Sequence, residues 1–568
     1  MTFLDDDDQP APRGRLRRRW WVYVTLAVVV AVAVIVPLAA GDDDEPAPSG
    51  TASAGDRSGP WRPGSGDLVH GTGTSRDGSR CAEGVRQVPA TGYSVPCLPA
   101  FRGDNGGATA QGVTADAIRI AVRRFPATAN AQGFEQAGSE AGFASAEDVD
   151  RIVGQWVDYF NEHFETYGRE VELVDFESEY GDPTQEAIGG GREAACADAT
   201  KIAQELHAFG VITQPVLVGD LTSSFGPFSE CAAQQGLVVF DAAPYYAESY
   251  YDDHHPYLWH LAMDCERLGY ELADYAVERL VGGRAAYAKG DLGGKPRVFG
   301  SYLADDPQYN KCGGRALELI QEASADLDLP DAALSDDNIV NYQLDFARFA
   351  EQAQRAVVQY KRRGVTTVFL ACDPVSIGFL TQAARQQDYF PEWVIIGVAA
   401  QDTDNFGRTY DQEVVEGSLF GFSQLGSNDK LFGSSSEPGR LYREAFGRSL
   451  PRNTNGWFFS LVNMFDLVQA AGPTLSAENI AAGVATLPDL GAPGYAYGRW
   501  SYATDPDGSS GSDHTALDDA REVYWDGDEV SPVDGEEGTW VETLGGKRFT
   551  PGDWPKGAPE LFGESAPG

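Results

Sequence analysis

Five residues with metal-binding side chains lie close together in the middle of the sequence. They are Asp252, Asp253, His254, His255 and His260. Imidazole and carboxylate groups are suitable ligands for divalent metals. Neighbouring residues in a chain rarely all point at one ion, because successive side chains leave the backbone in different directions. The sequence therefore favours a solvated loop here, and it predicts no metal and no cofactor.

Other motifs that could carry chemistry are incomplete. Asp505–Gly508 with Asp513 resembles a calcium loop but lacks the bidentate glutamate at the required spacing. The run Gly189–Gly191 does not follow a predicted strand, as a phosphate-binding loop must. The patterns G-x-S-x-G and H-E-x-x-H do not occur. A Ser/His/Asp triad is defined by geometry rather than by order, so the sequence leaves one open. Nothing points to one, and we predict that the protein is not an enzyme.

The elements that must position any site alternate between strands and helices from residue 115 onward. This alternation predicts a parallel sheet covered by helices on both faces. Two such series, separated near residues 255–295, predict an α/β protein of two Rossmann-like lobes. The predicted strands are 117–122, 170–176, 209–213, 237–241, 296–302, 367–371 and 394–398. The predicted helices are 149–164, 192–208, 223–235, 265–282, 311–325, 345–363, 375–387, 438–448, 455–471 and 476–486.

Ligands of open parallel sheets bind beyond the carboxyl ends of the strands. In a two-lobed protein both sets of strand ends can face one cleft. The segments that follow the predicted strands are therefore the candidates for a binding site. They are 124–128, 213–215, 241–243, 302–309, 372–376 and 399–404.

Residues 20–40 form an uninterrupted apolar stretch near the start of the chain. About 20 apolar residues span the hydrocarbon core as a helix. Five arginines precede the stretch between Arg13 and Arg19, and Asp42–Glu45 follow it. Positive charge stays on the cytoplasmic side, so we predict a single-pass signal anchor in the cell membrane with residues 1–19 inside and the C-terminal bulk outside. A cleaved signal peptide is the alternative.

Residues 41–110 are rich in Gly, Ser, Pro, Thr and Asp, and this composition predicts a disordered tether. An external location makes disulfides the default for the seven cysteines, although sequence alone does not fix their pairing. We predict the pairs Cys81–Cys97, Cys196–Cys231 and Cys265–Cys312. Cys372 is left over; it could be a nucleophile, but a buried and inert thiol at a strand end is the favoured interpretation.

The composition excludes one class of partner. The 568 residues carry a formal net charge of −42. Nucleic-acid binding depends on Lys and Arg that neutralise phosphates, so this charge argues against DNA or RNA. The length suits two lobes with additional segments. We place the two-lobed domain at 111–500 and an acidic, Gly-rich C-terminal extension at 501–568.

The stretch Gln111–Val122 (QGVTADAIRIAV) resembles the opening of type I periplasmic solute-binding proteins, in the Leu/Ile/Val-binding branch that serves ABC importers. Cys196–Ala203 (CADATKIA) resembles the cysteine-containing second helix of that family. Segments 211–215, 238–243, 298–309 and 368–373 follow in the family's order. The resemblance implies two lobes joined by three crossovers, closing on a small solute, and an ABC permease as a possible partner.

The resemblance also implies which residues contact the ligand. It points to the loops after the third and fourth strands and to an aromatic residue near Tyr309. The family's amino-acid binders place an acidic residue soon after the strand at 394–398, and here it is displaced to Asp402. With the other strand-end positions, the predicted ligand-binding residues are Arg124, Thr213, Gln214, Asp241, Ala242, Ala243, Tyr302, Tyr309, Asp373, Gln401 and Asp402.

These observations lead to one favoured function and two alternatives. We expect a membrane-tethered, extracytoplasmic solute-binding protein for amino acid or related transport. It would capture a small polar solute, such as an amino acid or amide, for an ABC importer. A sensor ectodomain that acts through a partner stays open, as does, with less support, an extracellular enzyme.

Overall fold

The computed structural model describes the chain in a series of segments. These are residues 72–125, 144–181, 186, 191–212, 226–242, 246–305, 307–343, 348–398, 401–451, 454–491, 495–502 and 513–563. The predicted segment 1–19, the membrane helix 20–40 and the first part of the tether lie outside the described residues. Within the residues that are described, no helix combines the length and the apolar character needed to cross a membrane.

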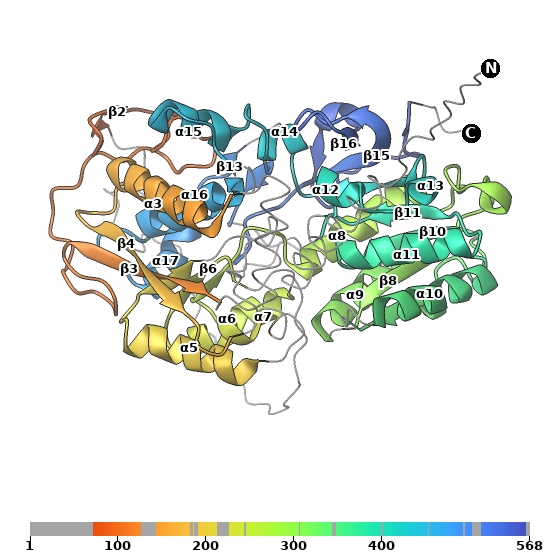
Figure 1. Cartoon of the computed structure of the whole chain (residues 1–568), viewed down its shortest axis with the longest axis horizontal. Helices are drawn as coiled ribbons and strands as arrows, with labels where there is room; N and C mark the ends of the chain where they lie inside the picture. Colours follow the sequence, from red (N-terminus) through yellow and green to blue (C-terminus); the bar gives the residue numbers. More distant parts are fainter. Residues whose placement is uncertain are drawn as a thin grey trace, which may run out of the picture.

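The first lobe is built on a five-stranded, all-parallel sheet in the order β4-β3-β5-β6-β7 (Figure 1). Side chains along β3 alternate between the two faces, as a pleated strand requires. Ile118 and Ile120 pack with α3 and α16, whereas Ala121 packs with α5 and α6. The strands are β3 (Ala117–Arg124), β4 (Glu170–Glu177), β5 (Gly210–Ile212), β6 (Val238–Phe240) and β7 (Leu258–Trp259). The helices are α3 (Ala146–His163), α5 (Arg192–Gln204), α6 (Gly226–Gln234), α7 (Glu248–Asp252), α15 (Glu437–Phe446), α16 (Asn455–Ala471) and α17 (Ala477–Val484).

The second lobe contains a larger, mixed sheet. Its parallel part has the order β9-β8-β10-β11-β12, and β15 and β16 extend it in antiparallel orientation. The strands are β8 (Phe299–Ala304), β9 (Ile339–Tyr342), β10 (Thr367–Ala371), β11 (Glu392–Ile395), β12 (Leu419–Ser423), β15 (Ala520–Val530), β16 (Glu537–Glu542) and β17 (Arg548–Phe549). The helices are α8 (Cys265–Tyr275), α9 (Pro307–Ala323), α10 (Phe349–Arg363), α11 (Pro374–Gln386), α12 (Asp404–Gly407), α13 (Gln412–Val415) and α14 (Asn428–Leu431).

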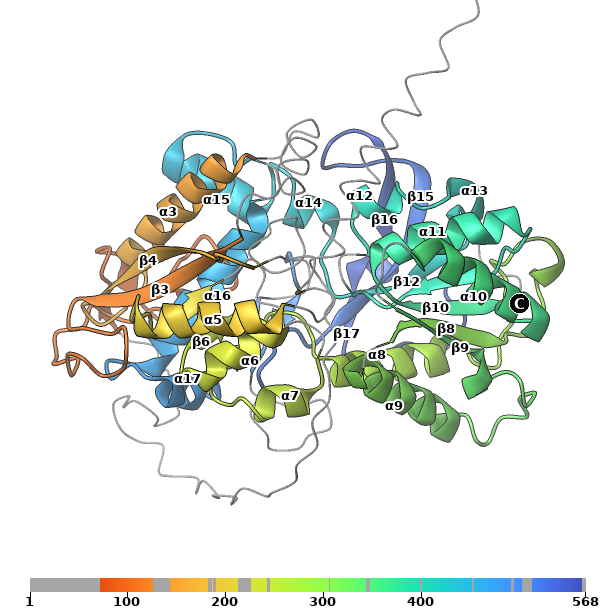
Figure 2. The same cartoon turned by 60° about the horizontal axis from the view of Figure 1, so that its bottom comes forward.

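The two lobes repeat one topology. Numbered along the chain, the parallel strands of each lobe have the order 2-1-3-4-5, a doubly wound arrangement that binds ligands at the carboxyl ends of its strands. The chain crosses between the lobes three times: after β7, after β12, and between β14 (Arg499–Trp500) and β15. In both views α16 and α17 lie with the strands of the first lobe (Figure 2). The predicted α/β fold of two lobes and three crossovers is therefore confirmed.

The prediction of a disordered tether up to residue 110 is wrong for its described part. Residues 72–110 pack against the first lobe, and the Tyr93 side chain is fully buried. The Tyr93 hydroxyl accepts a hydrogen bond from the Tyr497 backbone at 2.7 Å, and the Val95 backbone donates to Asp466 at 2.9 Å. The composition is that of a flexible segment, but burial of its few apolar side chains against the lobe offsets the entropy of ordering it.

The C-terminal segment is not an appended extension. The long strand β15 pairs with β12, so the last part of the chain completes the sheet of the second lobe. The buried aromatic side chains of Trp525 and Trp540 pack with the core of that lobe. The domain boundary predicted at residue 500 therefore divides a unit that the sheet holds together.

All three predicted disulfides are present. Cys81–Cys97, Cys196–Cys231 and Cys265–Cys312 are bonded, and Cys372 is a buried, free cysteine. Burial raises the pKa of the Cys372 thiol well above its usual range, and the neighbouring Asp373 raises it further. A thiol that keeps its proton is a poor nucleophile, which agrees with the inert role predicted for it.

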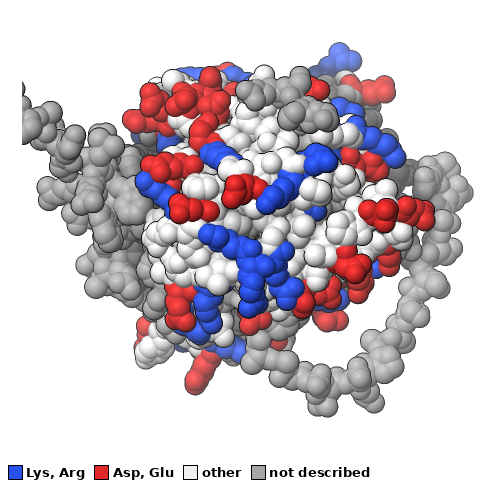
Figure 3. All heavy atoms as spheres, turned by 90° about the vertical axis from the view of Figure 1, so that its right-hand side faces the viewer, with Lys and Arg blue, Asp and Glu red and all other residues white. Residues whose placement is uncertain are grey.

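Surface charge is distributed unevenly over the second lobe. The face at its outer end shows Lys and Arg side chains gathered in the middle, with Asp and Glu around them (Figure 3). Three consecutive basic residues, Lys361, Arg362 and Arg363, end α10 in this lobe. Positive charge on this face is thus a local feature of a chain whose formal net charge is −42.

Candidate functional site

The carboxyl edges of both sheets lie toward the crossovers. Strand β7 runs directly into the first crossover, and β12 runs directly into the second. Three chain segments meet there through backbone and side-chain hydrogen bonds. The His260 amide donates to the His514 carbonyl at 2.9 Å, and the Met263 amide donates to the Gln424 side chain at 2.9 Å. Residues that follow the parallel strands therefore lie near the junction of the lobes, as the predicted site requires.

In the first lobe the described part of the predicted site is mostly internal. Asp241 and Ala242 are buried, and the Ala242 amide donates to the Trp259 carbonyl at 2.9 Å. Arg124 is partly exposed at the end of β3, where it pairs with Asp150 at 2.6 Å and Asp175 at 3.2 Å. Thr213, Gln214 and Ala243 lie outside the described residues.

Arg123, rather than Arg124, is the arginine that reaches the interior of the first lobe. Its side chain is 1% exposed and pairs with Glu186 at 2.5 Å and Asp198 at 2.6 Å. The guanidinium also lies over the rings of Phe125 and Phe228, at 4.6 and 4.4 Å from the ring centres. Alternation along β3 was a usable signal, because it places the side chains of residues 123 and 124 on opposite faces of the strand.

In the second lobe the predicted polar residues hold the loops in place. Asp373 caps α11, accepting from the Ser376 amide at 2.9 Å and from the Tyr342 hydroxyl at 2.6 Å. The Gln401 side chain donates to the Leu370 and Cys372 carbonyls at 2.7 and 2.6 Å. Asp402 accepts from the Ser423 hydroxyl. All of these groups are buried, so their contacts as described are within the protein, and their role in ligand binding stays a prediction.

Two predicted tyrosines have different surroundings. Tyr302 is buried and stacks on Tyr342, with ring centres 4.4 Å apart and an interplanar angle of 10°. Tyr309 is half-buried in the first turns of α9, and its ring centre lies 6.1 Å from that of Tyr246 of the first lobe. Tyr309 therefore stands where the two lobes meet.

An apolar cavity of about 120 Å³ lies in the second lobe, between the sheet and helices α8 and α9. It reaches the carboxyl ends of β8 and β10 at Ala304 and Ala371, and Tyr309 is part of its wall. Among the described residues that line it, none carries a charge. The sequence predicted Tyr309 as a ligand contact, which stays a prediction, and it gave no sign of the cavity.

Small residues let α8 and α9 pack closely together beside this cavity. Gly269 of α8 faces Ala316 of α9, where a Cβ atom at Gly269 would lie 3.6 Å from that of Ala316. The Cys265–Cys312 disulfide joins the same two helices and forms part of the cavity wall. The two helices are therefore in direct contact at these positions. Such an enclosure suits an apolar group that needs no charged partner.

Comparisons with known proteins reveal likeness in fold. No protein-family model matches the sequence, and no curated protein matches it. A solute-binding protein of an ABC transporter from R. palustris, in complex with 4-hydroxybenzoate, matches with a TM-score of 0.49 and 12% identity over 77% of this chain and 99% of that chain. A periplasmic binding protein from Burkholderia mallei matches with a TM-score of 0.49 and 12% identity over 77% and 96%.

A third structure is the ABC transporter substrate-binding protein from Desulfitobacterium hafniense in complex with Leu. It matches with a TM-score of 0.44 and 13% identity over 75% of this chain and 100% of that chain. Solute-binding proteins of ABC transporters, which the sequence resembles, are thus found among the similar structures. At these identities the likeness concerns the fold alone and assigns no ligand to this chain.

Proposed function

We propose that this chain is an extracytoplasmic solute-binding protein whose two lobes close on a small solute with an apolar body. The observation that carries the proposal is the uncharged cavity, which reaches the carboxyl ends of β8 and β10 beside Tyr309. Ligands of doubly wound sheets bind at this edge. The three crossovers supply the hinge about which two lobes of this kind can rotate.

The cavity indicates the chemical class of the solute. Its volume of about 120 Å³ is close to that of an engineered apolar cavity of about 150 Å³ that binds benzene. It therefore has room for one aromatic ring or a short branched chain. A polar group on the solute would remain at the mouth near Tyr309, where the two lobes meet. This differs from the plain polar solute expected from the sequence.

Ala371→Trp is expected to abolish binding of such a solute. Ala371 ends β10 and lines the cavity, and an indole there would occupy the space that the solute needs. In a thermal-shift screen with aromatic acids, branched-chain amino acids, amides and sugars, wild type should be stabilised by at least one ring-bearing or branched solute. A free solute concentration of 100 times Kd corresponds to an increase of about 2.7 kcal/mol in the free energy of unfolding.

The matched control is Ala323→Trp, at the exposed end of α9 and outside the cavity lining. This variant makes the same chemical change and should bind as wild type does. No shift with any class at millimolar concentration would contradict the proposed function. Equal binding by Ala371→Trp and wild type would contradict the proposed location.

We further propose that residues 20–40 anchor the chain in the membrane and that an ABC permease is its partner. The support is the apolar stretch between a run of arginines and a run of acidic residues, together with the resemblance in sequence. Mass spectrometry of the mature protein from the membrane fraction should find a chain that still contains residues 20–40. A mature chain that starts near Gly41 would contradict the anchor.

A further inference from the structure

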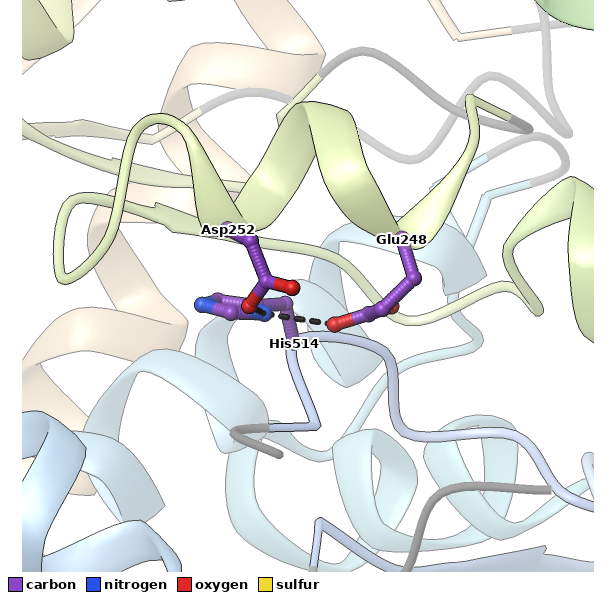
Figure 4. Close-up of side chains that lie close together, drawn as sticks. All are labelled: Glu248, Asp252 and His514. Carbon is purple, nitrogen blue, oxygen red and sulfur yellow. Dashed lines mark hydrogen bonds and ion pairs between the residues drawn. The ribbon is translucent and has the colours of Figure 1, made fainter. Parts of the chain in front are cut away.

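Three residues with metal-binding side chains converge beside the crossovers, outside the cavity. Glu248 and Asp252 lie one turn apart on α7 of the first lobe, and His514 lies in the third crossover. One ligand atom from each of the three lies within 4.8 Å of the other two. Figure 4 shows both carboxylates pointing from α7 toward the imidazole of His514. Residues some 260 positions apart in sequence thus present a ligand set on one side of one helix.

The distances are compatible with a metal ion after small movements. His514 Nδ1 lies 2.7 Å from Glu248 Oε1 and 3.9 Å from Asp252 Oδ1. Around a tetrahedral zinc ion with bonds of about 2.1 Å, ligand atoms lie roughly 3.4 Å apart. Shifts of less than about 1 Å would bring these two pairs to that spacing. Three protein ligands would leave the fourth position to water.

The hydrogen bonds around His514 orient its ring for this role. His514 Nδ1 shares a hydrogen bond of 2.7 Å with Glu248 Oε1, while His514 Nε2 lies 3.0 Å from His255 Nδ1. A second partner on the far ring nitrogen is the usual device that fixes the orientation of a ligating imidazole. A metal ion would take the place of the proton between His514 and Glu248. Binding would therefore release a proton, as it does when other protonated ligands bind a metal.

The local charge balance also favours a cation. Among the described residues, the carboxylates of Asp264, Asp513 and Asp252 and the guanidinium of Arg267 act electrostatically on Glu248. Arg267 is itself shared among the carboxylates of Asp264, Asp513 and Asp518. The second oxygen of Glu248 is buried and has no hydrogen-bond partner among the residues that the structure describes. The Asp252 side chain is 54% exposed, so an ion has a path from solvent to the site.

From these contacts we infer that Glu248, Asp252 and His514 form a binding site for a divalent transition-metal ion that ties α7 to the third crossover. One imidazole with two carboxylates suits zinc or a similar ion, whereas calcium and magnesium prefer oxygen ligands alone. Such an ion would join the first lobe to a segment that leads into the second. This inference does not depend on whether the chain binds a solute.

The test is a titration of the full chain, freed of metal with a chelator and carrying no polyhistidine tag. ZnCl₂ should bind with one-to-one stoichiometry in calorimetry and raise the melting temperature. Asp252→Asn, chosen because the position is half-exposed, should weaken binding by roughly 100-fold, and Glu248→Gln should do the same. Asp253→Asn changes the exposed neighbour and should bind zinc as wild type does.

Each further outcome decides the inference. CaCl₂ and MgCl₂ should produce a much smaller rise in melting temperature than ZnCl₂. Zinc affinity that is equal in wild type, Asp252→Asn and Glu248→Gln would overturn the site. So would the absence of any binding up to 1 millimolar zinc, which would leave the three residues as a hydrogen-bonded network only.

Discussion

Replacing Arg267 with methionine is expected to lower the free energy of unfolding by roughly 3–5 kcal/mol at pH 8. Arg267 is buried in α8, and its guanidinium lies 2.9 Å from Asp513 and 2.5 Å from Asp518. It also donates to the Leu517 carbonyl at 3.1 Å. Methionine has a similar volume but no charge, so Asp513 loses this counter-ion. Removing one partner of a buried ion pair costs far more than the pair contributes.

The two aspartates make this loss depend on pH. Burial raises the pKa of Asp513 to about 6 and that of Asp518 to about 7, although Arg267 lowers both. Without the guanidinium both pKa values rise further. The groups then take up protons as the pH falls, and a neutral carboxyl is cheaper to bury than an ion. We therefore expect the destabilisation to shrink between pH 8 and pH 5.5, measured by urea denaturation of both proteins at each pH.

Arg385→Met is the matched control for this prediction. Arg385 is 49% exposed and pairs with Glu413 at 2.6 Å on the surface. Exposed ion pairs contribute about 0–1 kcal/mol, so its loss should be small and should change little with pH. A loss of similar size in both variants would contradict a special role for the charge cluster around Arg267.

Asp241→Asn is expected to remove about 4 kcal/mol of pH dependence from the stability of the protein. Asp241 follows β6, is buried, and has a left-handed backbone (φ 64°) that asparagine also adopts readily. Burial raises the pKa of its carboxyl from 3.8 to about 7, and hydrogen bonds from Ser460 and Leu261 offset only part of this rise. Asparagine keeps the shape but cannot ionise.

The sign of this pH dependence follows from which state of the protein binds the Asp241 proton. Between pH 4 and 7 the folded protein holds the Asp241 proton, whereas the unfolded chain has lost it. The free energy of unfolding therefore falls as the pH rises through this window. The stabilisation that comes from the proton on Asp241 is fully present below pH 4. The difference in unfolding free energy between Asp241→Asn and wild type should then grow in favour of the variant from pH 4 to pH 7, in denaturation curves taken at half-unit steps.

Asp116→Asn, at an exposed position before β3, serves as the control and should leave the pH profile unchanged. Taking the difference from wild type removes the contributions of the other titrating groups, which both proteins share. A profile for Asp241→Asn that runs parallel to that of wild type would contradict the raised pKa.

The alternation of strands and helices could be predicted because it depends on local patterns. The helix predicted at 149–164 is α3, and the Ser145 hydroxyl caps its start by accepting from the Asp148 amide at 3.1 Å. The two lobes follow from two series of such units. Two strands of the parallel sheets, β7 with two residues and β9 with four, have no counterpart among the predicted strands. Their pairing depends on neighbours distant in the sequence.

The candidate sites were harder to predict because side-chain direction decides them. Asp373 and Gln401 follow strands, as expected of ligand contacts, yet Asp373 caps the start of α11 and Gln401 donates to the Leu370 carbonyl near the end of β10. Asp252 belongs to the predicted cluster of acidic residues and histidines, but the structure brings it together with Glu248 and His514. No local pattern relates residue 514 to residue 248, so the metal site could not be read from spacing.

The three crossovers have a consequence for biosynthesis. The first lobe needs α16, which ends at Ala471, to cover the sheet whose last strand ends at Trp259. At synthesis rates of about 5–20 residues per second, those two points emerge roughly 10–40 s apart. During that interval α3 covers one apolar face of the early strands without α16, which later packs beside it. The nascent chain therefore exposes part of this apolar face to aggregation until α16 has been made.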